Sequence, residues 1–353
     1  MLQTKKNLVL QTIKRNGLAG ITNLALRYYQ HKKLPDKPGY SPTALQVEIT
    51  TACNLKCTMC EHTYMQKVGG HMDFDQFKKL LDSNPNVQTL NITGIGEALM
   101  NPAFLDMVDY AKKKGIYVWF SDNMTLMTER SAKRLIGAGT DFIVLSLDGA
   151  TKETFEKIRV GARFEHVLEN TRRLIRLRDE QGKKTPLIGI NCVITKENYT
   201  EIEQMVQLAH EMKIDKLMFM TIFVSTNTGK FSLYSVSKEE IEQVLGKAQE
   251  TAKKLGVSVI AWPNPEVKMS KVTGCEYPWQ NPYVGYNGDV LPCCFIPQES
   301  KGREREENIM GNIFKDDLGT IWNSEKFTSF RQRIKTNDAP ISCKKCPKFY
   351  GLC

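Results

Sequence analysis

Long hydrophobic runs are absent from this sequence. The longest apolar stretches, such as Phe142–Leu147 and Leu217–Met220, are far shorter than the ~20 residues that a membrane-spanning helix needs. The amino terminus carries only a short apolar run, Leu8–Leu10, well below the roughly 7–15-residue core of a secretory signal peptide. We therefore expect no membrane-spanning segment and a cytoplasmic location.

Disulfide scaffolds, repeats and low-complexity tracts are also excluded. Ten cysteines in 353 residues are too few for a disulfide-dependent fold, and neither a fixed-period repeat nor a biased tract is present. A composition of 41% hydrophobic and 25% charged residues is typical of a globular protein and excludes a disordered or fibrous chain. The length predicts one large domain with a smaller appendage.

The cysteines that are present form clusters. Three lie within eight residues, six lie within the last 79 residues, and Cys192 stands alone. In a reducing cytoplasm, thiols serve metal binding or catalysis more often than disulfides. The clustering therefore predicts metal sites.

The first two thirds of the chain predict an α/β fold. Between residues 44 and 222, short β-branched runs alternate with amphipathic stretches, which is the pattern of consecutive βα units around a parallel sheet. The predicted strands are Ala44–Thr50, Val87–Thr93, Ile116–Asp122, Asp141–Leu147, Leu187–Ile194 and Lys216–Ile222. Six units are too few for a closed eight-stranded barrel, so we expect a partial (βα)6 TIM-like barrel.

Capping residues predict where several helices begin. Asp73 with Gln76 forms a capping box, and Asn101–Pro102 supplies a cap and a first-turn proline. Asn198 precedes a predicted helix over Tyr199–Met212.

The composition changes beyond Phe223, where a smaller domain is predicted. Ser237–Leu255 has a helical pattern, and Asn287–Gly288 between two apolar runs, Tyr283–Tyr286 and Val290–Cys294, favours a tight hairpin. A further helix is predicted over Leu318–Ile334. We divide the chain into a basic amino-terminal segment (1–40), a barrel domain (41–235), a helical and strand connection (236–270) and a small cysteine-rich domain (271–353).

The first 34 residues hold seven Lys or Arg and no Asp or Glu. Apolar residues recur at roughly helical spacing, and Gly17 and Gly20 predict a split into two helices; the apolar residues are Leu10, Ile13, Ile21, Leu24 and Tyr28. The segment is either an amphipathic lid packed on the barrel with a basic face in solvent, or a surface helix that docks on anionic lipid. The net charge of +10 also permits nucleic acid, but no recognised nucleic-acid module accompanies it, so we do not expect such a partner.

Three cysteines follow the first predicted strand with gaps of three and two residues. The segment is Cys53-Asn54-Leu55-Lys56-Cys57-Thr58-Met59-Cys60. Such a loop can wrap three corners of a cubane iron–sulfur cluster, because thiolates are the ligands that these clusters take, and it leaves the fourth iron open. The alternative is a closed zinc site, whose fourth ligand would come from His62, His71 or a distant segment.

This cysteine segment resembles the signature of the radical S-adenosylmethionine (radical SAM) enzymes, although Met59 stands where an aromatic residue is more usual. Thr93-Gly94-Ile95-Gly96-Glu97 resembles the family's Gly-Gly-Glu-Pro segment, with Ala98 in place of proline. The resemblance implies a partial six-unit barrel, S-adenosylmethionine as cofactor, and a 4Fe–4S cluster with an open iron on Cys53, Cys57 and Cys60.

The same resemblance implies a set of S-adenosylmethionine contacts. The methionyl amino group would be held by the segment that contains Gly94, Gly96 and Glu97. Ser146 and Arg159 would contact the ribose and the carboxylate, Asn191 the ribose, and Asn123 would line the same cleft. A carboxylate needs a cation or a fork of donors, which arginine supplies.

Four cysteines of the tail can hold a second cluster. They are Cys275, Cys293, Cys343 and Cys346. A zinc ribbon is the alternative from the residues alone. Together with Gly311-Asn312-Ile313 and Ile321-Trp322, the pattern resembles the SPASM domain, or its shortened twitch form, and implies one auxiliary 4Fe–4S cluster. Cys294 and Cys353 are left over, and Cys353 could replace one of the four.

The resemblance implies an oxidoreductase that cleaves S-adenosylmethionine with an electron from a flavodoxin- or ferredoxin-type donor. The resulting 5′-deoxyadenosyl radical would take a hydrogen atom from the substrate. An auxiliary cluster with four protein ligands would then accept an electron, which predicts a two-electron oxidation. The resemblance implies a sugar-like, cyclitol-like or peptide substrate.

Three alternatives stay open. One is an epimerase with Cys192 as hydrogen donor, although Cys192 faces the helices if Asn191 faces inward, because strand side chains alternate. Another is a lipid-modifying enzyme docked on a membrane. The last is a non-enzymatic zinc-binding protein that contacts nucleic acid or a membrane surface.

Overall fold

The structure is a computed structural model. It describes residues 18–30, 33–65, 69–222, 227–263, 274–296, 306–336, 338–346 and 349. The chain forms two compact units: the first contains Met1–Ala52, Gly69–Trp119 and Cys275–Lys344, and the second contains Cys53–Val68, Phe120–Gly274 and Lys345–Cys353. Among the described residues, no helix combines the length and the apolar character needed to span a membrane.

The first unit joins barrel strands to the hairpin of the tail. Its parallel strands are β1 (Ala44–Val47), β2 (Thr89–Asn91) and the first half of β3 (Tyr117–Asp122). On its other side, β1 pairs in parallel with β8 (Tyr283–Val284). The antiparallel strands β9 (Asp289–Leu291) and β10 (Gly311–Asn312) complete this part of the sheet. The helices are α2 (Phe74–Asp82), α3 (Phe104–Lys113), α11 (Leu318–Trp322), α12 (Glu325–Ile334), α13 (Ile341–Lys344) and residues 18–30.

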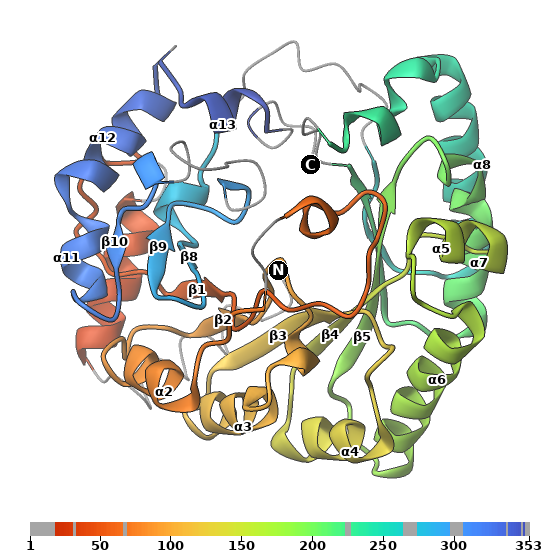
Figure 1. Ribbon diagram of the computed structural model, residues 1–353, viewed down its shortest axis with the longest axis horizontal. Helices are drawn as coiled ribbons and strands as arrows, with labels where there is room; N and C mark the ends of the chain where they lie inside the picture. Colours follow the sequence, from red (N-terminus) through yellow and green to blue (C-terminus); the bar gives the residue numbers. More distant parts are fainter. Residues whose placement is uncertain are drawn as a thin grey trace. The chain divides into compact units, whose positions relative to one another are not determined.

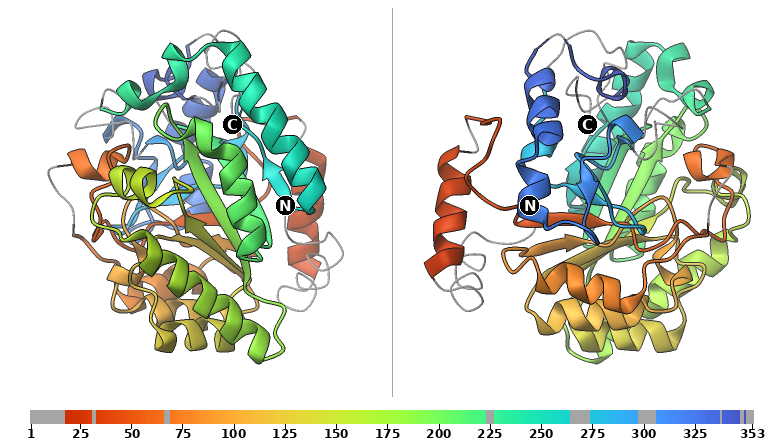
Figure 2. Two further views of the ribbon diagram at one scale, coloured as in Figure 1. Left: turned by 90° about the vertical axis from the view of Figure 1, so that its right-hand side faces the viewer. Right: turned by 60° about the vertical axis from the view of Figure 1, so that its left-hand side comes forward.

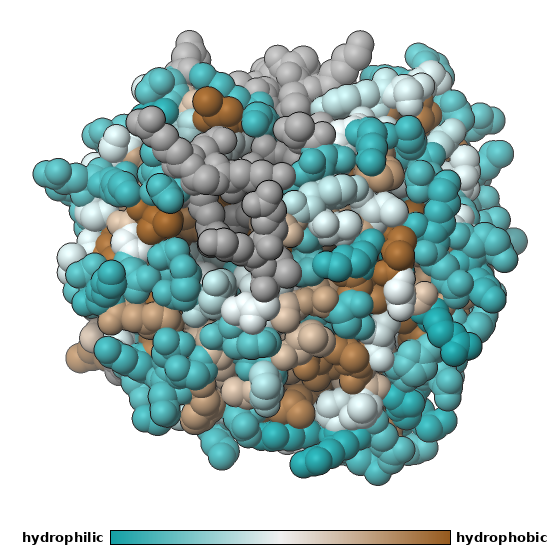
Figure 3. Space-filling model, in the orientation of Figure 1, coloured by the Kyte–Doolittle hydropathy of each residue, from teal (hydrophilic) through white to brown (hydrophobic). Residues whose placement is uncertain are grey.

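The second unit continues the alternation of strands and helices. Its parallel strands β4 (Phe142–Ser146), β5 (Leu187–Ile194), β6 (Lys216–Thr221) and β7 (Val259–Ala261) lie in chain order. The helices are α4 (Glu129–Ala138), α5 (Lys152–Ile158), α6 (Phe164–Glu180), α7 (Ile202–Glu211) and α8 (Lys238–Leu255). Helices α5 to α8 lie on the same side of β5 in the view of Figure 1. Helices α7 and α8 run side by side (Figure 2), and the surface over these helices is mostly hydrophilic (Figure 3).

The α/β fold with its series of parallel strands is confirmed, and all six predicted strands are present. The limits of Leu187–Ile194 agree with the prediction, because periodicity and β-branched content coincide there. Strand β1 is shorter than predicted and ends at Val47. A seventh parallel strand, β7, was not predicted; it lies in the segment assigned to the connection.

Helix starts were predicted correctly where the cap is local. The Asp73–Gln76 capping box begins α2, and the Ser237 side chain accepts from Glu240 N at the start of α8. The predicted start at Asn101–Pro102 is wrong, because Ala103 is the N-cap of α3. Asn101 Oδ1 accepts from Ala103 N (2.9 Å), so Asn101 supports the turn before α3, and its Nδ2 donates to Ile49 O (2.8 Å) and Met72 O (2.9 Å).

Two long helices were predicted as single but are divided. The segment after Asn198 begins with a 3₁₀ turn, Tyr199–Glu201, before α7. The segment Leu318–Ile334 forms α11 and α12, because Ser324 caps a new helix by accepting from Phe327 N.

The tight hairpin was predicted correctly. Strands β8 and β9 pair around Asn287–Gly288, and Gly288 has a φ of +85°, which favours glycine. At the amino terminus, residues 18–30 form one helix that runs through Gly20, so the division does not fall at Gly20, and a division at Gly17 stays a prediction. Leu10, Ile13 and Gly17 lie outside the described residues.

Candidate active site

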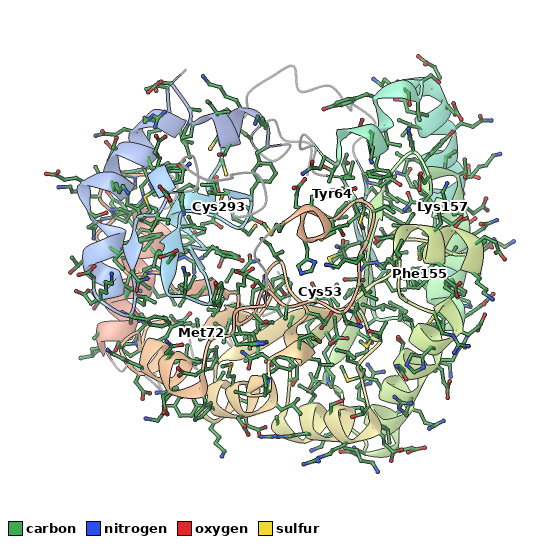
Figure 4. The ribbon with its side chains drawn as sticks, viewed as in Figure 1. Cys53, Tyr64, Met72, Phe155, Lys157 and Cys293 are labelled. Carbon is green, nitrogen blue, oxygen red and sulfur yellow. The ribbon has the colours of Figure 1, made fainter. Side chains whose placement is uncertain are left out.

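The loop with Cys53, Cys57 and Cys60 belongs to the second unit, where backbone hydrogen bonds hold its centre. Lys56 N donates to Val160 O (3.0 Å) and Thr58 N donates to Ile158 O (2.9 Å). These two bonds lie on either side of Cys57 and place it opposite Arg159, which follows α5. Figure 4 labels Cys53 at the start of this loop.

Burial and neighbouring charges raise the pKa of two of the three thiols. Burial raises the pKa of Cys57, and burial together with the charge of Cys57 raises the pKa of Cys60 to about 12. Cys53 also contributes to the pKa of Cys60. Among the described residues, no group of three or more His, Cys, Asp or Glu is arranged to hold a metal ion. Three soft donors on one loop suit an iron–sulfur cluster, and their role as its ligands stays a prediction.

Arg159 connects this loop to a buried carboxylate. Its Nε and Nη2 donate to Asp148 Oδ2 at 2.7 and 2.6 Å, and its Nη1 lies 3.9 Å from Cys57 Sγ. Asp148 is fully buried, and its Oδ1 accepts from Val193 N at 2.7 Å. Burial acts to lower the pKa of Arg159, but the charges of Asp148 and Cys57 outweigh it, so the pKa is raised and the cation is firmly held.

The contact of Arg159 with the S-adenosylmethionine carboxylate stays a prediction. The hydrogen bonds of the Arg159 guanidinium do not favour it. Two of the three guanidinium nitrogen atoms already bond to Asp148, and the third faces the Cys57 sulfur. Asp148 itself was not predicted. The signal available in the sequence was a carboxylate two residues beyond the end of β4, after the mostly apolar run Phe142–Leu147.

Ser146 and Asn191 are direct partners in the register of β4 and β5. Asn191 Oδ1 is buried and accepts no hydrogen bond from any residue that the structure describes. An unused buried acceptor is costly unless a ligand or water satisfies it, so this atom fits a hydroxyl donor such as that of a ribose. The unused acceptor of Asn191 therefore supports its predicted contact with the ribose, which stays a prediction.

Cys192 lies on the other face of β5 from Asn191, as strand alternation predicts. It is 2% exposed, and Asn198 Nδ2 lies 3.9 Å from its sulfur. Burial raises its pKa far above the ordinary value. The environment suits a small buried apolar residue rather than a hydrogen donor.

Asn123 holds the cysteine loop. Its Nδ2 donates to Asn54 Oδ1 (3.0 Å), and its Oδ1 accepts from the backbone N and the hydroxyl of Thr125 at 2.9 and 2.6 Å. Asn54 Nδ2 donates in turn to Thr125 Oγ1 (2.8 Å). The structure thus gives Asn123 a positioning role next to Cys53, and its place in the cofactor cleft stays a prediction.

Gly94, Gly96 and Glu97 form a tight turn after β2 in the first unit. Glu97 N donates to Ala52 O (2.8 Å). A Cβ on Gly96 would lie 2.4 Å from Thr50 O, so no larger residue fits. The glycines therefore have a steric role that is compatible with the predicted contact to the methionyl amino group.

Glu48 supports this turn and was not predicted. It is 1% exposed, and its Oε2 accepts from Ile95 N at 2.8 Å. Gln46 Nε2 donates to Thr93 O (2.9 Å) from the same face of the β1 segment. The missed signal was the alternation of polar Gln46, Glu48 and Thr50 with apolar residues in an internal strand.

Replacing Gly94 with alanine is expected to lower the free energy of unfolding by about 1–3 kcal/mol and to weaken S-adenosylmethionine binding. The new Cβ would lie 2.4 Å from Glu48 Cγ, which has no space to withdraw. Denaturant unfolding and equilibrium dialysis measure the two effects. The control is Gly137→Ala in α4, where nothing lies within 4 Å and a gain of about 0.5–1 kcal/mol is expected. An equal change in the free energy of unfolding in Gly94→Ala and Gly137→Ala would contradict the steric argument.

The second cysteine group lies mostly in the first unit. Cys275, Cys293 and Cys294 are half-buried, and Cys343 is buried on α13. Cys293 follows β9 and is labelled in Figure 4. Cys346 is buried and belongs to the second unit, and Cys353 lies outside the described residues. The ligand set Cys275, Cys293, Cys343 and Cys346 stays a prediction.

Family models match both cysteine-containing regions. Residues 47–209 match the radical SAM superfamily, and residues 275–347 match the SPASM iron–sulfur cluster-binding domain. The chain belongs to the radical SAM superfamily. The two matches fall inside the barrel and cysteine-rich regions expected from the sequence. This radical SAM enzyme therefore depends on S-adenosylmethionine and a 4Fe–4S cluster, with iron–sulfur binding also in its SPASM domain.

Similar proteins are named for cofactor modification or for bacteriocin biosynthesis. The chain is 29% identical over 316 residues to the tungsten-containing aldehyde ferredoxin oxidoreductase cofactor-modifying protein of Pyrococcus furiosus, covering 86% of each chain. It is 25% identical over 316 residues to the antilisterial bacteriocin subtilosin biosynthesis protein AlbA of Bacillus subtilis, covering 88% of this chain and 66% of AlbA.

A solved structure has a similar fold. Streptococcus suis SuiB bound to S-adenosylmethionine matches with a TM-score of 0.70 at 19% identity, covering 99% of this chain and 82% of SuiB. At that identity the match shows the fold alone.

Proposed function

We propose that this radical SAM enzyme removes two electrons and two hydrogens from a peptide substrate. The observation that carries the proposal is the second cysteine group, with Cys275, Cys293 and Cys343 in one unit and a SPASM match over it. When bound, the first cluster would supply the electron that cleaves S-adenosylmethionine to methionine and a 5′-deoxyadenosyl group. That group would take one hydrogen atom from the substrate, a proton would pass to water, and the auxiliary cluster would take up the remaining electron.

The names of similar proteins favour a peptide as the substrate. AlbA is named for the biosynthesis of a bacteriocin, and SuiB has been solved with its precursor peptide SuiA. The Pyrococcus protein is named for cofactor modification, so a small cofactor precursor is the second substrate class to test. A sugar or cyclitol is a third class, which the resemblance to the family implies.

Each group of residues has a proposed role. The first cluster is held by Cys53, Cys57 and Cys60. The auxiliary cluster is held by Cys275, Cys293, Cys343 and Cys346. The proposed S-adenosylmethionine contacts are Gly94, Gly96 and Glu97 in the first unit and Asn123, Ser146, Arg159 and Asn191 in the second. Buried Asp148 orients Arg159 toward Cys57, and the low dielectric of this site strengthens the attraction between the guanidinium and the thiolates.

We also propose two partners. A flavodoxin- or ferredoxin-type protein supplies the electron for cleavage. Residues 1–34, which hold seven basic and no acidic side chains, contact a membrane surface.

Anaerobic incubation with dithionite and S-adenosylmethionine tests the proposed reaction. The reconstituted protein is expected to form 5′-deoxyadenosine, and the triple replacement of Cys53, Cys57 and Cys60 by alanine is expected to abolish it. Cys192→Ala is the matched control and is expected to keep the rate within about twofold, because this thiol is buried away from Asn191. Mass spectrometry of candidate peptides is expected to show the loss of two hydrogens.

Two results would contradict this proposal. Absence of 5′-deoxyadenosine from fully reconstituted protein, with any of the three substrate classes present, would refute the cleavage reaction. A product that differs from the substrate only in stereochemistry and is lost in Cys192→Ala would establish the epimerase alternative.

A further inference from the structure

The helix of residues 18–30 turns its polar side chains toward the protein. Asn23 forms a reciprocal pair with Ser41: its Nδ2 donates to the Ser41 carbonyl (3.1 Å), and its Oδ1 accepts from the Ser41 N (2.7 Å). Arg27 donates to the Thr43 hydroxyl, and Gln30 Oε1 accepts from Gly39 N at 2.8 Å. Asn23, Arg27 and Gln30 lie on one face, since they are four and three residues apart.

The opposite face is apolar and open to solvent. Leu18, Ile21, Tyr28 and Tyr29 have exposed fractions of 83%, 36%, 78% and 66%. They account for four of the eight exposed large hydrophobic side chains among the described residues. Figure 2 shows the helix on the outside of its unit.

This polarity is the reverse of what a packed lid requires. An amphipathic helix in a lid buries its apolar stripe and exposes its polar one. The interpretation as a lid is therefore wrong for residues 18–30, and something outside the described chain must cover the apolar stripe to remove it from water.

The charge of the surrounding segment indicates what covers it. Residues 1–34 contain seven Lys or Arg and no Asp or Glu. Lys33 lies beside the stripe, with Nζ 3.0 Å from Tyr29 Oη and 4.4 Å from the centre of that ring. A second copy of the chain would bring two basic segments together, which like-charge repulsion opposes. An anionic lipid surface attracts them.

We propose that the apolar stripe of Leu18, Ile21, Tyr28 and Tyr29 docks this protein on an anionic bilayer. The helix lies in the plane of the interface with Leu18 and Ile21 at the level of the acyl chains, and the tyrosines lie at the headgroups. The basic side chains bind lipid phosphates. This deepens the membrane contact proposed above for residues 1–34 but does not depend on the radical reaction.

Flotation of the full-length protein with vesicles tests the docking. Binding is expected to vesicles that contain phosphatidylglycerol, to fall with added salt, and to be weak on pure phosphatidylcholine. The double variant Leu18→Glu/Ile21→Glu is expected to bind about tenfold more weakly. The matched control is Tyr234→Glu/Ile341→Glu, which places the same charges on two exposed apolar positions elsewhere and is expected to bind like the parent protein.

Three outcomes would overturn the proposal. They are no binding of the parent protein to the anionic vesicles, equal loss in the control variant, and a lipid-independent dimer that dissociates in the Leu18→Glu/Ile21→Glu variant. Circular dichroism and iron content check that each variant is folded. Since vesicle binding is measured without turnover, failure of the proposed reaction does not affect this test.

Discussion

Replacing Arg159 with methionine is expected to shift the reduction potential of the first cluster to a more negative value and to slow S-adenosylmethionine cleavage by about 10–100-fold. The guanidinium Nη1 lies 3.9 Å from Cys57 Sγ, and a cation beside a ligand stabilises the more negative, reduced state of the cluster. Removing the cation therefore makes reduction harder. A redox titration followed by electron paramagnetic resonance measures the shift directly.

The effect of Arg159 on the cluster must be separated from its effect on folding. Arg159→Met leaves the fully buried Asp148 carboxylate without its cation, so the free energy of unfolding is expected to fall by about 3–5 kcal/mol. The double variant Asp148→Asn/Arg159→Met removes the unpaired charge, while the oxygen of the introduced side-chain amide can still accept from Val193 N. This double variant is expected to recover much of the free energy of unfolding, but the reduction potential of the first cluster is expected to stay as negative as in Arg159→Met.

Arg163→Met is the matched control for Arg159→Met. Arg163 is exposed, four residues further along the chain, and its replacement is expected to leave both the potential and the stability unchanged. An unaltered potential in Arg159→Met, at full iron content, would show that this arginine has no electronic influence on the cluster.

Replacing Arg331 with methionine is expected to lower the free energy of unfolding by about 3–5 kcal/mol and the melting temperature by roughly 10 °C. Arg331 is 0% exposed on α12 and donates to three backbone carbonyls, those of Pro278 (3.0 Å), Asp36 (3.1 Å) and Trp322 (2.7 Å). Its guanidinium also lies 4.2 Å from the centre of the Trp322 ring. Methionine preserves the volume but leaves all three carbonyls unsatisfied.

Calorimetry and iron analysis measure the consequence of the Arg331 replacement. Because this side chain joins residues 35–36 and 277–279 to α12, loss of the auxiliary cluster is expected at a lower temperature than loss of the first cluster. The control is Arg333→Met on the same helix, whose side chain is 45% exposed and pairs with Asp338. A change of less than about 1 kcal/mol in Arg331→Met would mean that water satisfies the carbonyls.

Features that depend on neighbours in the chain could be predicted from the sequence. The limits of β5 follow from a run of β-branched residues, and the starts of α2 and α8 follow from caps whose partner is three residues away. The spacing of Cys53, Cys57 and Cys60 pointed to the radical SAM superfamily, because the separation of side chains on one loop depends only on the residues between them. The Asn287–Gly288 hairpin was predictable for the same reason.

Pairings between distant segments needed the tertiary structure. Cys57 and Arg159 are 102 residues apart, and nothing in either segment reveals that two backbone bonds align them. The role of buried Asp148 is visible only from its contact with Arg159. The role of buried Glu48 is visible only from its packing against the turn at Gly94. Likewise, periodicity marked an amphipathic helix near residue 20, but the contacts of Asn23, Arg27 and Gln30 decided which face is turned outward. Periodicity records that a helix has two faces, whereas the orientation of those faces depends on hydrogen-bond partners elsewhere in the chain.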